Sequence, residues 1–458
     1  MRPHRVRAAR ALLPVLAGVL AAACADRSAP DPALVLITLD TFRQDHLGCA
    51  GNPVVRTPHL DRLERRGVQW PDAVTAIPLT TPSHATILTG LSPRGHGLLK
   101  NRMRLDEAVP TLATRLAAAG YRTGAVVSSG IVLGPEFGLD RGFDSYRVVE
   151  SETRPASGGG ALTARASLGW LGEHGGPGSF HWVHFFDAHL PYLPPPPLGR
   201  LYAPDYAGSL DASAHAIQQD LREAERVDPA DVAYLRAQYA GEITFLDASV
   251  GRILTFLELR HPATTVLVTA DHGEGLYEHQ RYFGHDVLLH ETSVRVPLLL
   301  AGPAAPRTRF PGRLAPGPAR TVDVAPTLLG AAGIEPETRL EGADLPAEPV
   351  REGQAARAVL ESHPSRGKSP DLYALRAPDA KVIWAPPGTR EAYDLSEDPG
   401  ETRDLAADDR ADHAEMLRHL LYDLRENPPG AALTVDAERG GPDAETRAAL
   451  ESLGYVDR

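Results

Sequence analysis

The stretch ALVLITLD, residues Ala33 to Asp40, carries the clearest fold signal in this 458-residue chain. Its run of apolar and β-branched residues is typical of a strand buried on both faces of a parallel sheet. A second run, TTVLVTA at 264–270, has the same character and is followed directly by Asp271 and His272. In open α/β sheets, ligands bind at the carboxyl ends of the parallel strands. We therefore expect Asp40, Asp271 and His272 to lie close together.

Helical patterns alternate with these strands, which indicates an α/β sheet. Apolar residues recur at helical spacing in the stretches that we predict to be helices: 57–66, the run after Pro82, 111–119, 228–259 and 320–334. Two stretches rich in glycine or proline, 157–164 (SGGGALTA) and 301–320, are predicted to be surface loops.

The pattern of predicted elements changes near Glu335, where we place the start of a second unit. We predict a main domain at 32–334, a smaller subdomain at 335–427 and a Gly- and Pro-rich tail at 428–458. The elements predicted in the subdomain are strands at 358–361, 373–376 and 381–384 and a helix at 412–424.

The first residues have the pattern of a secretory signal peptide. Four arginines precede an apolar run at 11–23, which is too short to span a membrane, so residues 1–23 are excluded from the fold. Cys24 follows Leu20-Ala-Ala-Ala23, which resembles a bacterial lipobox and predicts a lipid anchor on Cys24; simple cleavage nearby is the alternative. We expect an exported protein, periplasmic or on the cell surface, that meets the membrane only through this anchor.

Charge and cysteine content narrow the class of protein further. The net charge of −12 argues against nucleic acid as a partner, because a polyanion needs a broad basic surface. A small anionic ligand bound locally is compatible with this charge. The two cysteines, Cys24 and Cys49, exclude a disulfide framework.

The stretch PLTTPSHATILTG, residues Pro78 to Gly90, predicts a helix whose start faces an anion. Pro82 suits the first helical position, Thr80 and Thr81 come just before it, and Gly90 is a plausible stop. Free N–H groups and the helix dipole at such a start favour an oxyanion. The alternative is that a threonine merely caps the helix.

These residues together offer the ligands of a divalent metal ion. Asp40, Asp271 and His272, with a threonine hydroxyl, supply oxygen and nitrogen donors, although each acid alone could be a helix cap or a loop residue. A bound metal would activate the hydroxyl. Two segments at 181–197 and 271–303 add histidines near acids: His184, Asp187, His189, His279, His285 and His290. Of these we expect His189 and His285 to be functional.

Several segments, in this order, resemble the sulfatase family of the alkaline phosphatase superfamily over nearly all of the mature chain. They are LITLDTFRQDHLGCAG (36–51), TTPSHATILTG (80–90), HFFDAHLPYLPP (184–195), TADHGEGLYEH (269–279), FGHDVLLHETSVRVPLL (283–299), DVAPTLLGAAGI (323–334) and EAYDLSEDPGETRDLA (391–406). The resemblance implies a large mixed, mostly parallel sheet flanked by helices, with a smaller C-terminal α+β subdomain. It also implies a hydrolase acting on small anionic esters.

The resemblance implies a role for each matching residue. The metal ligands would be Asp40, Thr80, Asp271 and His272. Thr80 takes the place of the family's signature cysteine and would be the nucleophile, whereas Thr81 would be a bystander. His189 would touch the bound ester, His285 would lie near the leaving oxygen, and His84 replaces the signature arginine. The metal would be one or two divalent ions among zinc, manganese, calcium and magnesium, with Asp187 and His189 as candidate ligands of a second ion.

The chain departs from the family pattern where the chemistry is decided. Family sulfatases convert the signature cysteine, or sometimes a serine, to formylglycine, which a threonine cannot form. A phosphorylated threonine is an ordinary covalent intermediate, and Thr-x-Pro-Ser-His is similar to the Thr-x-Pro-Asn-His of nucleotide pyrophosphatase/phosphodiesterases. Thr41 replaces a second metal-binding aspartate of many members, and SSGIVLG at 128–134 replaces a segment that supplies a lysine and a histidine.

Three functions are compatible with these residues. The first is a metal-dependent hydrolase or transferase of phosphate or phosphonate esters, which the choice of nucleophile favours. The second is a sulfuric ester hydrolase, which the family name implies. The third is a metal-binding lipoprotein that keeps the fold and has lost turnover.

Overall fold

The computed structural model describes residues 31–434 with gaps. The described residues are 31–149, 159–208, 210, 228–280, 283–285, 288–306, 309–310, 313–336, 340–347, 357–363, 370–386, 388–408, 410–429 and 433–434. The predicted signal peptide at 1–23 and Cys24 lie outside them. Residues from Pro32 onward belong to one compact unit. In the described part of the chain, no helix combines the length and apolar character needed to cross a bilayer.

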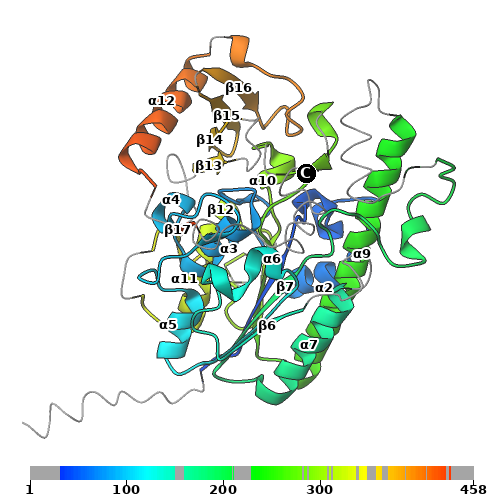
Figure 1. The fold of residues 1–458 in the computed structure, drawn as a ribbon, viewed down its shortest axis with the longest axis vertical. Coiled ribbons are helices and arrows are strands. Elements are labelled where there is room, and N and C mark those ends of the chain that lie inside the picture. The colour runs from blue at the N-terminus through cyan, green and yellow to red at the C-terminus, as the bar shows by residue number, and fades with distance from the viewer. Residues whose placement is uncertain are drawn as a thin grey trace, which may run out of the picture. The chain divides into compact units, whose positions relative to one another are not determined.

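A seven-stranded mixed sheet forms the centre of the fold (Figure 1). Its strands, in spatial order, are β2 (Gly67–Gln69), β11 (Leu298–Ala301), β8 (Thr265–Ala270), β1 (Leu34–Leu39), β7 (Ser179–Phe185), β5 (Arg122–Val127) and β6 (Ser145–Val148). The five strands from β8 to β6 are parallel, whereas β11 and β2 pair antiparallel. The predicted mixed, mostly parallel sheet is therefore confirmed.

The register of β1 explains why distant acids meet. Leu39 is paired with Ala270 of β8 on one side and with Phe185 of β7 on the other. The chain leaves both β1 and β8 at the next residue, so Asp40 and Asp271 emerge side by side at the carboxyl edge of the sheet. The expectation that these two acids are neighbours is confirmed.

Helices cover both faces of the sheet. One layer contains α2 (Pro58–Arg66), α7 (Gly159–His174) and α9 (Pro229–Arg260), which contact one another and strands β5, β7 and β11. The opposite layer contains α3 (Thr80–Thr89), α5 (Leu112–Ala118) and α11 (Val324–Ala331) (Figure 1). The helices predicted at 57–66, 111–119, 228–259 and 320–334 are confirmed, with ends that differ by a few residues.

Short elements complete the main part of the chain. They are β3 (Ala73–Val74), α4 (Pro93–His96), β4 (Met103–Arg104), α6 (Gly130–Leu133), β9 (Gly275–Leu276), β10 (Phe283–Gly284), α10 (Glu291–Val294) and β12 (Ala319–Arg320).

Two predictions of local structure are wrong. Helix α3 begins at Thr80, so Pro82 is its third residue rather than its first; the position is tolerated because the N–H groups of a first turn have no partner within the helix. The predicted loop at 157–164 is helical from Gly159 onward, where α7 starts. Its glycines are held by a distant residue, because Asp187 Oδ1 accepts the Gly160 N–H at 2.7 Å.

The C-terminal part contains a second, antiparallel sheet. Its strands are β13 (Ala358–Ser362), β14 (Leu372–Arg376), β15 (Ala380–Ala385) and β16 (Thr389–Asp394). Helix α12 (Ala411–Glu426) packs on one face through Met416 and Leu420, and the other face packs on Leu289 and Val294 of the main part. In the predicted tail, β17 (Leu433–Thr434) pairs with β4. The predicted domain boundary at 335 stays a prediction.

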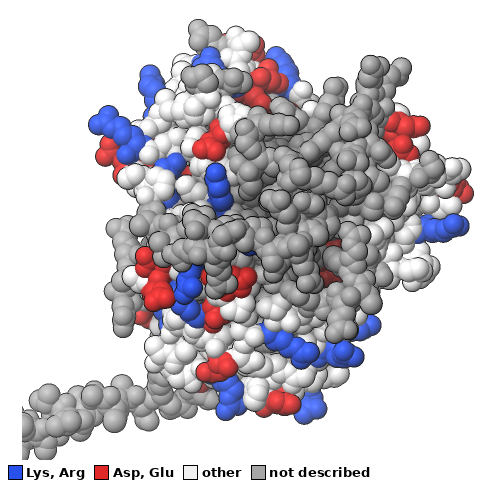
Figure 2. All heavy atoms as spheres, in the orientation of Figure 1, with Lys and Arg blue, Asp and Glu red and all other residues white. Residues whose placement is uncertain are grey.

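Charged side chains of both signs are interspersed over the described part of the face that Figure 2 shows. No extended basic patch is visible among the described residues of that face.

Candidate metal centre and active site

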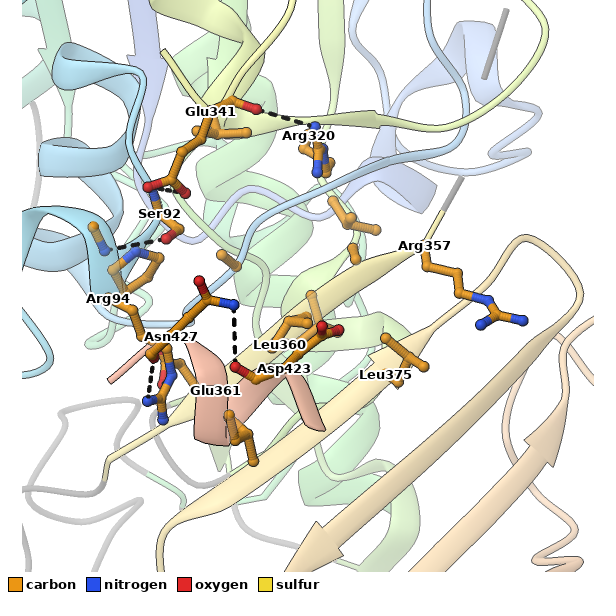
Figure 3. Close-up of a pocket in the computed structure, with 18 of the residues that line it drawn as sticks. Ser92, Arg94, Arg320, Glu341, Arg357, Leu360, Glu361, Leu375, Asp423 and Asn427 are labelled. Atoms are coloured by element: carbon orange, nitrogen blue, oxygen red, sulfur yellow. Dashed lines mark hydrogen bonds and ion pairs between the residues drawn. The ribbon is translucent and has the colours of Figure 1, made fainter. Parts of the chain in front are cut away.

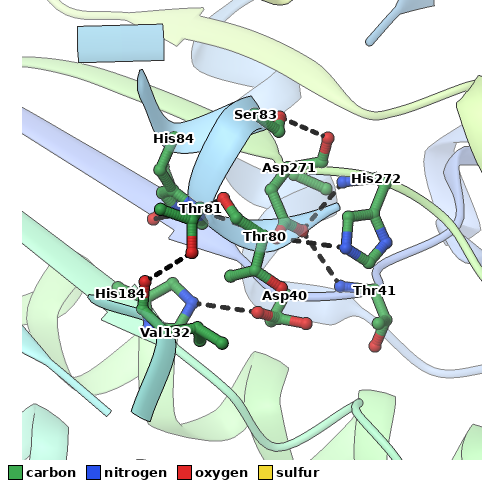
Figure 4. Close-up of polar contacts among 12 residues, drawn as sticks. Asp40, Thr41, Thr80, Thr81, Ser83, His84, Val132, His184, Asp271 and His272 are labelled. Carbon is green, nitrogen blue, oxygen red and sulfur yellow. Dashed lines mark hydrogen bonds and ion pairs between the residues drawn. The ribbon is translucent and has the colours of Figure 1, made fainter. Parts of the chain in front are cut away.

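Three predicted ligands meet at the carboxyl edge of the central sheet (Figure 4). One ligand atom from each of Asp40, Asp271 and His272 lies within 4.8 Å of the other two, and all three side chains are fully buried. Among the described histidines, cysteines and acids, this is the group with the geometry of a metal site.

The donor atoms of this group fit a divalent cation. Asp40 Oδ1, Asp271 Oδ2 and His272 Nε2 are buried and make no hydrogen bond with the described residues. The rest of the His272 ring is held in place: Nδ1 lies 2.9 Å from the Gly273 carbonyl, so it carries the proton and leaves Nε2 as an acceptor. Three unsatisfied acceptors at one buried point are costly for a protein alone and are satisfied by a cation.

The electrostatics of the two acids agree with this interpretation. Burial raises the pKa of Asp40 to about 8 and raises the pKa of Asp271 well above its usual range. The charge of Asp40 raises the pKa of Asp271 further, because two carboxylates so close together repel each other. A divalent cation held by Asp40 and Asp271 would favour their charged forms and reverse these shifts.

Thr41 is held in a strained conformation beside these ligands. Its φ of 51° is in the left-handed region, which is unfavourable for a β-branched residue. In this conformation its N–H donates to Asp271 Oδ1 at 3.1 Å, and Tyr239 Oη donates to its carbonyl at 2.7 Å. The strain therefore helps to orient Asp271.

Thr80 and Thr81 have different environments at the start of α3. The Thr80 side chain is fully buried and lies beside the Asp40 carboxyl (Figure 4). Thr81 Oγ1 instead donates to the Val132 carbonyl at 2.7 Å and accepts the Arg102 N–H at 3.3 Å. Thr80 is thus the threonine that faces the metal ligands (Figure 4).

His84 lies one turn into α3, and both of its ring nitrogens have protein partners. Nδ1 donates to the Thr80 carbonyl at 2.9 Å, and Nε2 lies 3.1 Å from Thr38 Oγ1, which also accepts a hydrogen bond from Trp182 Nε1. Burial lowers the pKa of His84 well below its usual range, so the ring is neutral. These hydrogen bonds hold the start of α3 against β1.

His189 and His285 lie together next to His272. The rings of His189 and His285 are 5.2 Å apart, and those of His272 and His285 are 4.2 Å apart. His189 Nδ1 donates to the Leu190 carbonyl at 2.7 Å, and burial, helped by His285, lowers the pKa of His189 to about 3. His285 Nδ1 faces a carboxylate, Glu274 Oε1, at 3.2 Å.

Of the other candidate residues in these segments, His184 touches the ligand group, whereas Asp187, His279 and His290 lie outside it. His184 Nε2 is 3.3 Å from Asp40 Oδ2, whereas His279 and His290 stack at 3.9 Å, with His290 bonded to Glu391 of β16. Asp187 holds the start of α7 and is not part of the ligand group. The described residues therefore give no support to the second-ion site suggested for Asp187 with His189.

Two polar residues near the site do not stand out in the sequence. Glu274 is fully buried beside His285, and burial raises its pKa. Asn101 Oδ1 accepts the Thr81 N–H at 2.9 Å, while its Nδ2 is buried and has no hydrogen-bond partner among the described residues. Glu274 was detectable because it lies two residues beyond a predicted ligand; Asn101 had no local signal.

A separate cavity of about 690 Å³ lies between α4, β13 and α12 (Figure 3). Its charged lining residues are of both signs, and none of them belongs to the ligand group. It is therefore distinct from the candidate active site.

Fold and site together define a hydrolase that acts on ester bonds. Residues 32–334 match the family model described as Sulfatase. The chain belongs to the sulfatase family, within the alkaline phosphatase superfamily, whose members are metal-dependent.

Curated relatives and solved structures are similar to this chain along most of its length. The chain is 26% identical to the steryl-sulfatase of Mus musculus, over 88% of this chain and 85% of that protein. It is 25% identical to the multifunctional alkaline phosphatase superfamily protein PehA of Trinickia caryophylli, over 68% of this chain and 76% of that protein. The phosphonate monoester hydrolase of Agrobacterium radiobacter superposes with a TM-score of 0.71 at 22% identity, covering 88% and 97% of the two chains.

Proposed function

We propose that this protein is a metal-dependent hydrolase, or transferase, of phosphate or phosphonate esters with Thr80 as its nucleophile. The observation that carries the proposal is the position of Thr80. It is the first residue of α3, it is fully buried, and it lies beside Asp40 of the metal-ligand group (Figure 4). A threonine cannot become formylglycine, so the family's usual route for sulfate is closed to this residue.

Asp40, Asp271, His272 and Thr80 would hold the metal. A divalent ion there would lower the pKa of the Thr80 hydroxyl and offset negative charge on the ester oxygens. A histidine ligand suits zinc or manganese better than calcium.

The chain's own groups account for the covalent steps. Thr80 Oγ1 releases its proton to solvent and attacks phosphorus, the bond from phosphorus to the leaving oxygen breaks, and the leaving oxygen takes a proton from His285. Water then attacks phosphorus and returns one proton to His285, the bond to Thr80 Oγ1 breaks, and Oγ1 regains a proton from solvent. The start of α3 supplies N–H groups and a dipole that favour the anionic ester.

The histidines would divide the remaining tasks. We assign protonation of the leaving oxygen to His285, because its Nδ1 is held by Glu274 Oε1 at 3.2 Å and its ring lies next to that of the ligand His272. His189 lies beside His285, and we assign to it a contact with the bound ester. His84 would act as a positioning residue, since both of its ring nitrogens are bonded to α3 and β1.

Sulfuric ester hydrolysis is the second candidate. The names of curated relatives favour it, since they include a steryl-sulfatase and an arylsulfatase. In this protein it would require direct hydrolysis of a sulfated threonine or attack by water without a covalent intermediate.

Turnover assays separate the candidates. We expect the purified protein to hydrolyse p-nitrophenyl phosphate diesters or phosphonates in preference to p-nitrophenyl sulfate. Thr80→Ala should abolish this activity, and Thr81→Ser, which keeps the Thr81 hydroxyl, should retain it. Turnover of sulfate alone, or full phosphoester turnover by Thr80→Ala, contradicts the proposal. Metal binding without turnover of any ester would favour a binding protein.

We also propose that the chain is exported and anchored through Cys24. The signal pattern at 1–23 supports this. Labelled palmitate should enter the wild-type protein in a bacterial host and not the Cys24→Ser variant; equal labelling would overturn the anchor.

A further inference from the structure

The loop that carries two proposed metal ligands is hydrogen-bonded to the short helix α10. After β8, the Gly273 N–H donates to the Ser293 carbonyl at 2.8 Å, and the Glu274 N–H donates to the Thr292 carbonyl at 3.0 Å. A Cβ at position 273 would overlap the Thr292 carbonyl oxygen, so the two backbones are in close contact. The position of Asp271 and His272 therefore depends on the position of α10.

A carboxylate from the C-terminal part holds the start of α10. Glu401 Oε2 accepts the backbone N–H of Glu291, the first residue of α10, at 2.6 Å. The residue before the helix, His290, gives no side-chain cap of its own. Glu401 thus satisfies an N–H that the helix leaves free, and its negative charge suits the helix dipole.

Lys381 joins this carboxylate to the helix. Lys381 is in β15 and fully buried. Its Nζ lies 2.7 Å from Glu291 Oε1 and 2.8 Å from Glu401 Oε1, and it donates to the Leu289 carbonyl at 3.0 Å. Two carboxylates and one carbonyl therefore surround the ammonium group. Loss of this cation would leave Glu401 without its cation beside Glu291, which Arg376 still contacts at 3.0 Å, and an uncompensated buried carboxylate is strongly unfavourable.

We propose that Lys381 is a positioning residue for the metal centre. By bridging Glu291 and Glu401 it fixes α10, and through α10 it fixes the loop that carries Asp271 and His272. The inference rests on the metal centre proposed above, and it gives the C-terminal sheet a role in the chemistry of the main part.

A second, largely buried ion pair between the main part and the C-terminal sheet provides a matched control. Arg94 of α4 lies 3.1 Å from Glu361 of β13 through its Nε, and its Nη1 donates to the Asn427 carbonyl at 3.0 Å (Figure 3). Among the described contacts, none of the hydrogen bonds of this pair reaches α10. Arg94→Met therefore removes a cation from the contact between the main part and the C-terminal sheet. It leaves the link from Lys381 through α10 to the ligand loop unchanged.

The test measures metal affinity rather than activity. Full-length wild type, Lys381→Met and Arg94→Met are stripped with EDTA and titrated calorimetrically with Zn²⁺, Mn²⁺ and Ca²⁺, well below the Tm of each variant. For the ion that wild type binds most tightly, we expect Lys381→Met to weaken binding roughly three- to thirtyfold. Arg94→Met should lower Tm and leave the affinity within about twofold.

The outcomes separate this inference from the proposed function. Equal affinities in Lys381→Met and Arg94→Met overturn the positioning role and leave the metal centre intact. Failure of wild type to bind any of the three ions overturns the metal centre, and the inference with it. If Lys381→Met does not fold, Glu401→Gln, which keeps an acceptor for the Glu291 N–H, must weaken metal binding in the same direction, or the inference is wrong.

Discussion

Thr80 and Thr81 have the same side chain, but their hydroxyl groups have different neighbours. Thr81 is occupied by the Val132 carbonyl and the Arg102 N–H, whereas Thr80 faces Asp40. We infer from the sequence that Thr80 takes the place of the family cysteine, which would keep the site and change its chemistry. A hydroxyl that cannot be oxidised to an aldehyde limits the nucleophile to ordinary ester exchange.

The loss of kcat/KM on substitution of His285 is expected to be larger for esters with a poorer leaving group. His285→Gln should lower kcat/KM for an alkyl phosphonate ester at least about a hundredfold, because an alkoxide needs a proton to leave. The loss for the p-nitrophenyl ester should be about threefold or less, since nitrophenolate leaves unprotonated. Steady-state kinetics on both esters measure this, with His279→Gln, on the same segment, as the control. An equal loss on both esters would exclude His285 as the acid.

Helix starts were harder to predict than strands and helix interiors. The strands at 34–39 and 265–270 follow from continuous apolar runs, and the long helix at 229–260 follows from its periodicity. The start of α7 could not be predicted, because its glycines are held by Asp187, which comes from a different strand and loop. The start of α3 was misplaced by two residues, because Pro82 is tolerated anywhere in a first turn.

The two glycines Gly169 and Gly90 are predicted to respond to alanine with opposite sign. Gly169 lies in the interior of α7, and a Cβ added there would meet no described atom within 4 Å, so Gly169→Ala should raise the free energy of unfolding by about 0.5–1 kcal/mol. Gly90 ends α3 at a φ of 72°, so Gly90→Ala should lower it by about 1 kcal/mol. Urea unfolding measures both values. A destabilised Gly169→Ala would show that α7 does not tolerate a side chain there.

The whole molecule brings its site together from segments that are far apart in sequence. Asp40 and Asp271 could be predicted as neighbours because parallel strands share one edge. Asn101 and the environment of His84 could not, because they depend on side-chain contacts between loops and helices. The link from the C-terminal sheet to α10 was also invisible, since Lys381 and Glu401 have no local motif.

The buried ion cluster of Glu291, Lys381 and Arg376 predicts how the free energy of unfolding depends on pH. Burial alone would raise the pKa of Glu291, but Lys381 and Arg376 hold it well below its usual range. Ionised Glu291 therefore stabilises the fold fully above the pKa of an unfolded glutamate, about 4.3, and this contribution is lost as the pH falls towards the native pKa. Glu291→Gln should be less stable than wild type at pH 7, with a difference that shrinks below about pH 4. Urea unfolding at a series of pH values tests this, and a difference independent of pH would be inconsistent with the cluster.

The most direct test of the central claim is to find the atom that carries the covalent intermediate. The protein is mixed with p-nitrophenyl phenylphosphonate, quenched with acid during the first turnovers, digested and mapped by mass spectrometry, with Thr80→Ala as the control. We predict a phenylphosphonyl group on Thr80 in wild type and none in the variant. Turnover with an unmodified Thr80, or the group on Thr81 or Ser83, would contradict the account.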